Sequence, residues 1–304
     1  MSRRKGRRYN YESDKVKLEL IHKELPVSVN PRLNRLFSQN GKCLQVALDH
    51  GAVNVPSLIP GIEDMQKVIG AVAAAGPDAI LVSTGQAHCL QDLKQNPKPA
   101  LVIRVDIPNI YCVPTPNRVF CKLIDEAAEQ AVALDAAAIV LNLFWAPDQP
   151  DLHRQCIANI VRIKPQCERY GMPMMVEPML LLPDEKGGYK INPDISQTVA
   201  LARQAVEWGA DIVKADLAEQ LDEYHLVVEA SAPKPLLPRG GARVSDMEIL
   251  TRTHTLIQQG ASGVVYGRNI YQHSHPQRMV RACHAVVHDG ATVAAAMAIL
   301  DDVV

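Results

Sequence analysis

Hydrophobic positions along this chain fall into two alternating kinds of segment, short β-branched runs and longer stretches with apolar residues at helical spacing. Short apolar runs bounded by turn residues are typical of strands buried on both faces of a parallel sheet. The chain contains eight such runs, which are CLQVALDH (43–50), DAILVS (78–83), ALVIRVD (100–106), AAIVLNL (137–143), PMMVE (173–177), ADIVKAD (210–216), KPLLPRGG (234–241) and SGVVYGR (262–268).

The segments between the runs predict helices, and several of them end on the glycine that commonly follows a helix. They include residues 62–76, 123–136, 153–171 and 195–209. Strands that alternate with helices predict a parallel sheet, and eight repeats fit an α/β fold of the closed (β/α)₈ TIM-barrel class. An open doubly wound sheet is the alternative.

Two regions follow from this pattern. Residues 41–304 are expected to form the barrel, with closing helices near the C-terminus over 275–290 and 291–302. Residues 1–40 are expected to form a short N-terminal helical extension, in which VKLELIHKEL (16–25) and NPRLNRLF (30–37) supply leading helices across the bottom of the barrel, after a mobile basic tail.

Composition narrows the class of protein. Apolar residues make up 47% and charged residues 21% of the 304 residues, and no run reaches the roughly 18 apolar residues of a membrane span. A formal charge of −1 argues against nucleic acid as the partner of the folded body, although RRKGRR (3–8) is locally basic. Seven cysteines without a C-x-x-C pair, and no apolar leader, indicate a cytoplasmic protein. No zinc-ligand spacing is present, and we expect neither metal nor cofactor.

Polar residues stand where the predicted strands end, which is where barrels of this class place their active sites. Any one of them is explained as a polar residue meeting water, but together they predict one charged mouth. They are Asp49, His50, Arg104, Asp106, Asn142, Glu177, Lys214, Asp216, Arg239, Gly240, Gly241, Gly267, Arg268 and Asn269.

Lys214 carries the most specific chemistry. On its own, a lysine at a strand end more often solvates the terminus. A lysine held among apolar strands and near other cations instead has a lowered pKa, and its neutral amine can attack a ketone to form an iminium. Such chemistry needs a general acid/base, for which Asp49 and His50 are candidates. Glu177 is a further candidate if burial raises its pKa toward neutrality.

The last two strands predict a phosphate site. RGG (239–241) and YGRN (266–269) place glycine turns with free backbone N–H groups where such barrels frequently bind phosphate. Arg268, and Arg243 just past the first turn, would add charge-assisted hydrogen bonds. A single Gly-Gly pair is usually only a turn, so the prediction depends on the recurrence of the pattern.

These motifs together resemble the DhnA-type class I aldolases, a family that includes archaeal-type fructose-bisphosphate aldolases and LsrF-type thiolases. The resemblance runs from about residue 41 to the C-terminus and is carried by VALDHG (46–51), GADIVKAD (209–216), RGGARVSD (239–246) and above all GASGVVYGRNIYQHSHPQRMVRACHAVVH (260–288). It implies a homo-oligomer acting on a small phosphorylated substrate.

Carried over by position, the resemblance implies a role for each matching residue. Lys214 is the Schiff-base lysine, Asp49 the acid/base, and His50 matches a histidine of the thiolase-like members. Arg104 supports the substrate or the charge balance. The implied phosphate site comprises Gly240, Gly241, Gly267 and Arg268.

Two positions depart from the family pattern. Met179 stands about where fructose-bisphosphate aldolases carry a tyrosine acid/base, with Glu177 near the preceding aromatic position, and Ala242 stands where relatives often carry a lysine. Cleavage of fructose 1,6-bisphosphate is therefore left open. The leading hypothesis is a Schiff-base lyase on a phosphorylated ketone. A transferase on the same scaffold, either thiolase-like or aminodideoxyheptulosonate synthase-like, and a non-catalytic phosphosugar-binding protein are the alternatives.

Overall fold

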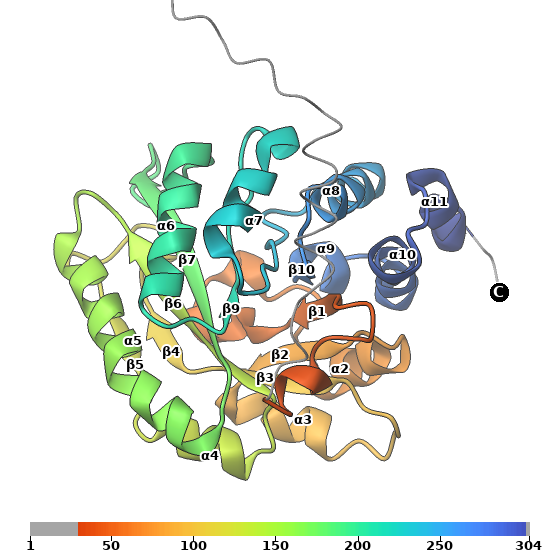
Figure 1. Ribbon diagram of the computed structural model, residues 1–304, viewed down its shortest axis with the longest axis horizontal. Coiled ribbons are helices and arrows are strands. Elements are labelled where there is room, and N and C mark those ends of the chain that lie inside the picture. The colour runs from red at the N-terminus through yellow and green to blue at the C-terminus, as the bar shows by residue number, and fades with distance from the viewer. Residues whose placement is uncertain (1–29, 302–304) are drawn as a thin grey trace, which may run out of the picture.

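The computed structural model describes residues 30–301, and its parallel strands close into a barrel with helices outside (Figure 1). Hydrogen-bonded neighbours follow the order β10, β1, β2, β3, β6, β7, and β9 pairs with the other edge of β7. The strands are β1 (Cys43–Ala47), β2 (Ala79–Ser83), β3 (Ala100–Arg104), β6 (Ala138–Trp145), β7 (Met174–Pro183), β9 (Ile212–Val213) and β10 (Gly263–Tyr266). The predicted (β/α)₈ barrel is confirmed.

The seventh predicted run, 234–241, is not a continuous strand. It closes the ring through two isolated bridges, Leu236 with Val213 on one side and Arg239 with Val265 on the other. Pro235 and Pro238 lie within this run, and proline has no N–H to donate to a ladder. The expectation of a regular strand over 234–241 is wrong for this reason. The run nevertheless takes the seventh position in the barrel, as the sequence predicted.

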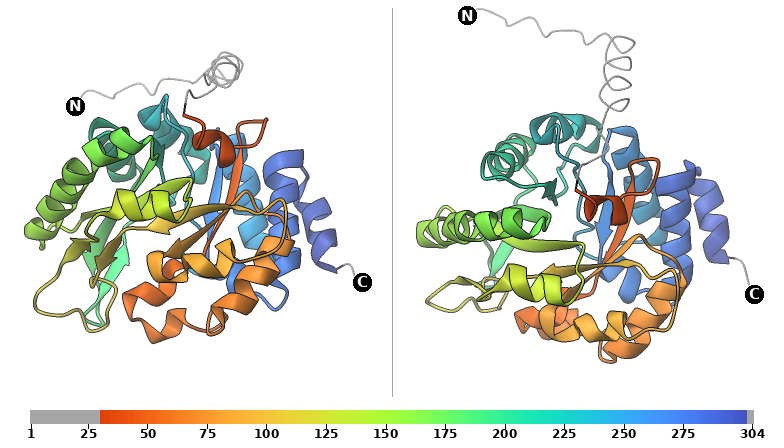
Figure 2. Two further views of the ribbon diagram at one scale, coloured as in Figure 1. Left: turned by 90° about the horizontal axis from the view of Figure 1, so that it is seen from below. Right: turned by 60° about the horizontal axis from the view of Figure 1, so that its bottom comes forward.

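Ten α-helices within residues 30–301 surround the strands (Figure 2). They are α2 (Met65–Ala74), α3 (Ala87–Gln91), α4 (Ala127–Ala133), α5 (Pro150–Tyr170), α6 (Ile195–Glu207), α7 (His225–Ser231), α8 (Asp246–Gln258), α9 (Arg268–Tyr271), α10 (Pro276–Asp289) and α11 (Val293–Asp301). Asp64 and Ser245 cap the starts of α2 and α8 with their side chains, and Gly171 ends α5 in the left-handed conformation. None of the helices over 30–301 has the length and apolarity to cross a membrane.

The N-terminal segment seals the lower end of the barrel. Leu36, just after a short helical turn over Leu33–Arg35, is buried with inward-facing strand residues such as Cys43 and Leu81. Arg32 donates to the carbonyl oxygen of Ala136 at 2.6 Å, on a loop that enters β6. The helix predicted over 16–25 and the basic tail lie outside the described residues.

Two antiparallel excursions, absent from the predicted pattern, stand over the upper end. One pairs β4 (Asp106–Pro108) with β5 (Cys121–Leu123), and the other pairs β8 (Tyr189–Ile191) with the extended end of β7. They touch where the N–H of Thr115 donates to the carbonyl oxygen of Gly187 at 2.8 Å. All seven cysteines are free thiols, and six are buried, whereas Cys112, between β4 and β5, is partly exposed.

Candidate active site

A cavity of about 380 Å³ opens at the carboxyl ends of the strands and is lined by most of the polar residues that the sequence singled out. Asp216 and Asn269 are buried beside it. Arg243 is exposed and does not line the cavity, so its predicted part in a phosphate site is not supported. The residues brought together are Asp49, His50, Arg104, Asp106, Asn142, Glu177, Lys214, Arg239, Gly240, Gly241, Gly267 and Arg268.

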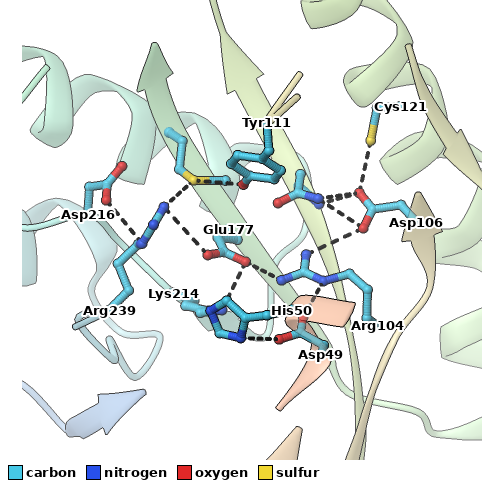
Figure 3. A network of polar contacts seen from close by, with 12 residues as sticks. Asp49, His50, Arg104, Asp106, Tyr111, Cys121, Glu177, Lys214, Asp216 and Arg239 are labelled. Atoms are coloured by element: carbon cyan, nitrogen blue, oxygen red, sulfur yellow. Dashed lines mark hydrogen bonds and ion pairs between the residues drawn. The ribbon is translucent and has the colours of Figure 1, made fainter. Parts of the chain in front are cut away.

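Lys214 directly follows β9 and turns its side chain inward. The residue is 5% exposed, so it does not solvate the strand end. Its Nζ donates to Glu177 Oε2 at 3.0 Å (Figure 3). Burial lowers the pKa of Lys214 although the charge of Glu177 opposes that shift. Burial therefore makes this amine easier to deprotonate than a solvated lysine.

Arg104, at the end of β3, binds three carboxylates at once. Its Nε lies 2.8 Å from Asp49 Oδ2, one terminal nitrogen lies 2.5 Å from Glu177 Oε2, and the other lies 3.4 Å from Asp106 Oδ1. A planar guanidinium presents its donors in a fixed fork, so it fixes all three acceptors relative to one another. This geometry gives Arg104 a role in charge balance within the protein.

Glu177, on β7, is held as a carboxylate. Burial alone would raise its pKa, but the charges of Lys214, Arg104 and Arg239 outweigh burial and hold the pKa of Glu177 well below its ordinary value. Arg239 approaches its Oε1 at 3.9 Å. The expectation that burial would bring this group toward neutrality is wrong, because three cations converge on it.

Asp49 and His50 open the short helical turn after β1, beside the lysine. Burial opposes ionisation of Asp49, yet the charges of Arg104 and Lys214 hold its pKa below the ordinary value. His50 Nδ1 lies 3.8 Å from Asp49 Oδ1, and burial lowers the pKa of His50 to about 4, so the imidazole is neutral near pH 7. Asp49 is therefore a proton acceptor, and the neutral imidazole can accept or donate a hydrogen bond.

The two glycine turns lie side by side. Gly241 has φ +64, in the left-handed region that favours glycine. A Cβ on Gly267 would lie 2.4 Å from His50 Cε1, so this turn approaches the imidazole closely. Arg268 donates to the carbonyl oxygen of Gly241 at 2.8 Å, and its buried Nε has no hydrogen-bond partner among the described residues. The N–H of Gly240 already donates to the carbonyl oxygen of Val265 at 3.1 Å, whereas Arg268 Nε is available to donate to an anion.

Two further side chains converge on Glu177. Tyr111, from the connection between β4 and β5, donates its hydroxyl to Met179 Sδ at 3.4 Å. Arg239 lies at the end of the seventh run, where it contacts the same sulfur and pairs through Nε with Asp216 Oδ1 at 3.3 Å. Burial raises the pKa of Asp216 to about 6. Strand-end reasoning pointed to Arg239 and Asp216 but missed Tyr111, since nothing in a loop sequence places its side chain in the mouth.

Comparison with known proteins bears on the family and the fold of this chain. A sequence profile described as DeoC/LacD family aldolase matches residues 43–273. An uncharacterised aldolase of Saccharolobus solfataricus is 29% identical over 88% of this chain and 97% of its own length. A 3-hydroxy-5-phosphonooxypentane-2,4-dione thiolase of Yersinia pseudotuberculosis is 28% identical over 87% of this chain and 84% of its own. The structure of a Schiff-base-forming fructose-1,6-bisphosphate aldolase superposes with a TM-score of 0.71 at 22% identity, covering 85% of this chain and 99% of that one.

Proposed function

Because the chain belongs to the DeoC/LacD family of aldolases, we propose that it makes or breaks a carbon–carbon bond through a Schiff base between Lys214 and a phosphorylated ketone. The observation that carries the proposal is the buried amine of Lys214, which faces the cavity with a lowered pKa and lies 3.0 Å from Glu177. An amine in this setting is a nucleophile, whereas a solvated lysine near neutral pH is not.

The proposed reaction follows from the charges around that amine. The neutral amine attacks the carbonyl carbon, and loss of water gives an iminium, whose positive charge Glu177 balances. In the cleavage direction, a base takes the proton of the hydroxyl next to the bond that breaks. The carbon that bears this oxygen leaves as an aldehyde, and the electrons of the broken bond move into the iminium to give an enamine. Protonation at carbon and hydrolysis then release the ketone and restore the lysine. Asp49 and His50 are the proposed proton carriers, because both line the cavity beside Lys214.

The phosphate is proposed to lie on the two glycine turns. Gly240, Gly241 and Gly267 bring backbone close to the cavity, although the N–H of Gly240 already donates to the carbonyl oxygen of Val265 at 3.1 Å. Arg268 adds a guanidinium whose Nε is without a hydrogen-bond partner among residues 30–301. Backbone N–H groups and an arginine are the donors that phosphate oxygens accept best. The loops after the seventh and eighth strand positions supply these groups. Barrels of this class frequently bind phosphate at that place.

Reduction with borohydride in the presence of dihydroxyacetone phosphate tests the Schiff base. The intact mass should increase by the reduced adduct, and the label should lie on the peptide that contains Lys214. Lys214→Arg should abolish the adduct, since a guanidinium stays protonated, whereas the matched surface change Lys234→Arg should keep it. A label on Lys186, Lys190 or Lys234 would contradict the assignment. No adduct with any phosphorylated ketone would favour the non-catalytic phosphosugar-binding alternative.

A thiolase-like acyl transfer is the second candidate. It is favoured by Met179, a thioether that cannot carry protons and that follows Glu177 by two residues on β7, where it accepts from the Tyr111 hydroxyl. The 28% identity to a thiolase that acts on a phosphorylated dione supports the same reading. Incubation with a phosphorylated 2,4-dione and a thiol acceptor should then give an acylated thiol. Formation of an aldehyde and a ketone, with no acylated thiol, would favour the lyase.

A further inference from the structure

One wall of the cavity holds a buried acceptor that the protein does not satisfy. Asn142, at the upper end of β6, is 1% exposed. Its Nδ2 donates to both carboxylate oxygens of Asp106 at 3.0 Å, and its backbone N–H donates to Oδ2 at 2.6 Å. A carboxylate accepts and does not donate, so this pairing fixes which way the amide points. Asn142 Oδ1 therefore points away from Asp106, and it is buried without a hydrogen-bond partner among the described residues.

The Tyr111 hydroxyl lies in the same cavity with only a weak partner. It donates to Met179 Sδ at 3.4 Å, and a thioether sulfur is a poor acceptor. Its ring packs edge-on against Phe144, with centroids 5.7 Å apart, so the ring is held in place. In Figure 3 the ring lies next to Glu177 and Arg239. An oxygen atom of a ligand would be a better acceptor for this hydroxyl than the sulfur.

The barrel order places this wall opposite the glycine turns. β6 is the fourth and β10 the eighth strand position of the ring, so their upper ends face each other across the mouth. Lys214 follows the sixth, between them. A ligand with its phosphate on the turns and its carbonyl carbon at Lys214 therefore extends toward Asn142 and Tyr111.

We propose that Asn142 Oδ1 and the Tyr111 hydroxyl form a binding subsite for a hydroxyl group on the carbon next to the ketone, on the side away from the phosphate. This inference rests on the proposed Schiff base at Lys214. A hydroxyl satisfies both partners, since it donates to the amide oxygen and accepts from the phenol. An ammonium group could donate to Oδ1 but has no lone pair with which to accept a hydrogen bond from the Tyr111 hydroxyl, so it would satisfy only one of the two partners. The site therefore selects phosphorylated α-hydroxy ketones.

Two ligands that differ only in this hydroxyl test the proposal on the unchanged protein. Dihydroxyacetone phosphate carries it, and hydroxyacetone phosphate lacks it. Half-maximal borohydride trapping at Lys214 should need about 5- to 150-fold more of the deoxy ligand, the range expected when a buried acceptor is left without a partner. Equal trapping of both ligands overturns the subsite and leaves the Schiff base intact. No adduct from either ligand overturns the Schiff base itself, and the subsite with it.

Variants then assign the effect to residues. Tyr111→Phe removes the hydroxyl and keeps the ring packed on Phe144. It should reduce the ratio of the two half-maximal trapping concentrations, deoxy ligand over dihydroxyacetone phosphate, by about 2- to 10-fold. A merely structural defect would lower trapping of both ligands equally, and that result would remove Tyr111 from the subsite. Asn142→Ser keeps a donor for Asp106 while withdrawing Oδ1, and it should narrow the ratio further. Tyr170→Phe, whose hydroxyl donates to Glu129 on the outer surface, is the matched control and should keep the full ratio.

Discussion

Replacing Arg104 by methionine removes the cation that joins Asp49, Asp106 and Glu177, and keeps a side chain of similar length. The guanidinium lies 2.8, 3.4 and 2.5 Å from the three carboxylates, and its side chain is only 10% exposed. Breaking a buried ion pair by removing one partner costs about 3–5 kcal/mol, because the remaining charge is left uncompensated. We therefore expect Arg104→Met to lower the free energy of unfolding at pH 7 by at least that amount.

The loss should also depend on pH, with a sign that follows from the pKa values. In the wild type, burial works against ionisation, yet neighbouring cations hold the pKa values of Asp49 and Glu177 below their ordinary values. Depressed pKa values give stability that is present above pH 4–5, roughly the unfolded values, and is lost as pH falls. Without Arg104 the pKa values of Asp49 and Glu177 rise, so the variant has less of this stability to lose as pH falls. The gap between the two proteins should narrow from pH 7 toward pH 4.

Urea denaturation followed by circular dichroism at several pH values measures this gap. Arg154→Met is the matched control, because Arg154 pairs with Asp151 at 3.1 Å on the surface, where the side chains are 80% and 89% exposed. Such a pair contributes about 0–1 kcal/mol, so the control should stay close to wild type. The reasoning fails if the two variants lose equal stability, or if the loss in Arg104→Met is the same at pH 7 and pH 4.

Three further expectations follow. Arg268→Ala should weaken trapping of a phosphorylated ketone by about 1.5–3 kcal/mol, or about 10- to 150-fold, and leave its unphosphorylated form unaffected; an equal effect on both forms, measured by half-saturation of the adduct, would remove Arg268 from the phosphate site. Fructose 1,6-bisphosphate should be cleaved poorly in a coupled aldolase assay, since a positioned acid/base contributes about 10²–10⁴-fold and Met179 cannot serve; ordinary rates that Glu177→Gln abolishes would show that the glutamate does that work. Gly267→Ala should destabilise the protein by about 1–3 kcal/mol because its Cβ would lie 2.4 Å from His50 Cε1; a double-mutant cycle with His50→Ala should recover most of that loss in thermal unfolding, and additive losses would contradict the contact.

The barrel and the membership of its mouth could be predicted because both depend on local periodicity. Eight apolar runs separated by helical segments leave few topologies, and residues at strand ends must then meet at one face. Lys214 and Glu177 were identified because they lie at or near the ends of predicted apolar runs, and the structure brings Lys214 Nζ to 3.0 Å from Glu177 Oε2. Arg243 lies just past the turn, where its side chain is exposed and does not line the cavity, so the structure does not support its predicted part in a phosphate site.

The rest depends on contacts between parts of the chain that are distant in sequence. The pKa of Glu177 is lowered by Lys214, Arg104 and Arg239, which come from three other strand positions. The apolar residues next to Glu177 in the sequence indicate burial alone, and burial would raise that pKa. Tyr111 enters the cavity from an excursion whose two strands are only three residues each, too short for a pattern to reveal. Proline at 235 and 238 shows why an apolar run need not form a ladder.

The seven cysteines have a practical consequence for spectroscopy. Six thiols are buried, and burial raises the pKa of several of them, including Cys167 and Cys283, to about 12 in each case, so they react slowly with thiol reagents. Cys112 is partly exposed and directly follows Tyr111 in the excursion over the mouth. A fluorophore attached to the natural protein would thus report from one position, beside the hydroxyl that meets the ligand. Its emission during a titration with a ligand would report how the segment between β4 and β5 responds to binding. No cysteine would have to be introduced for this measurement.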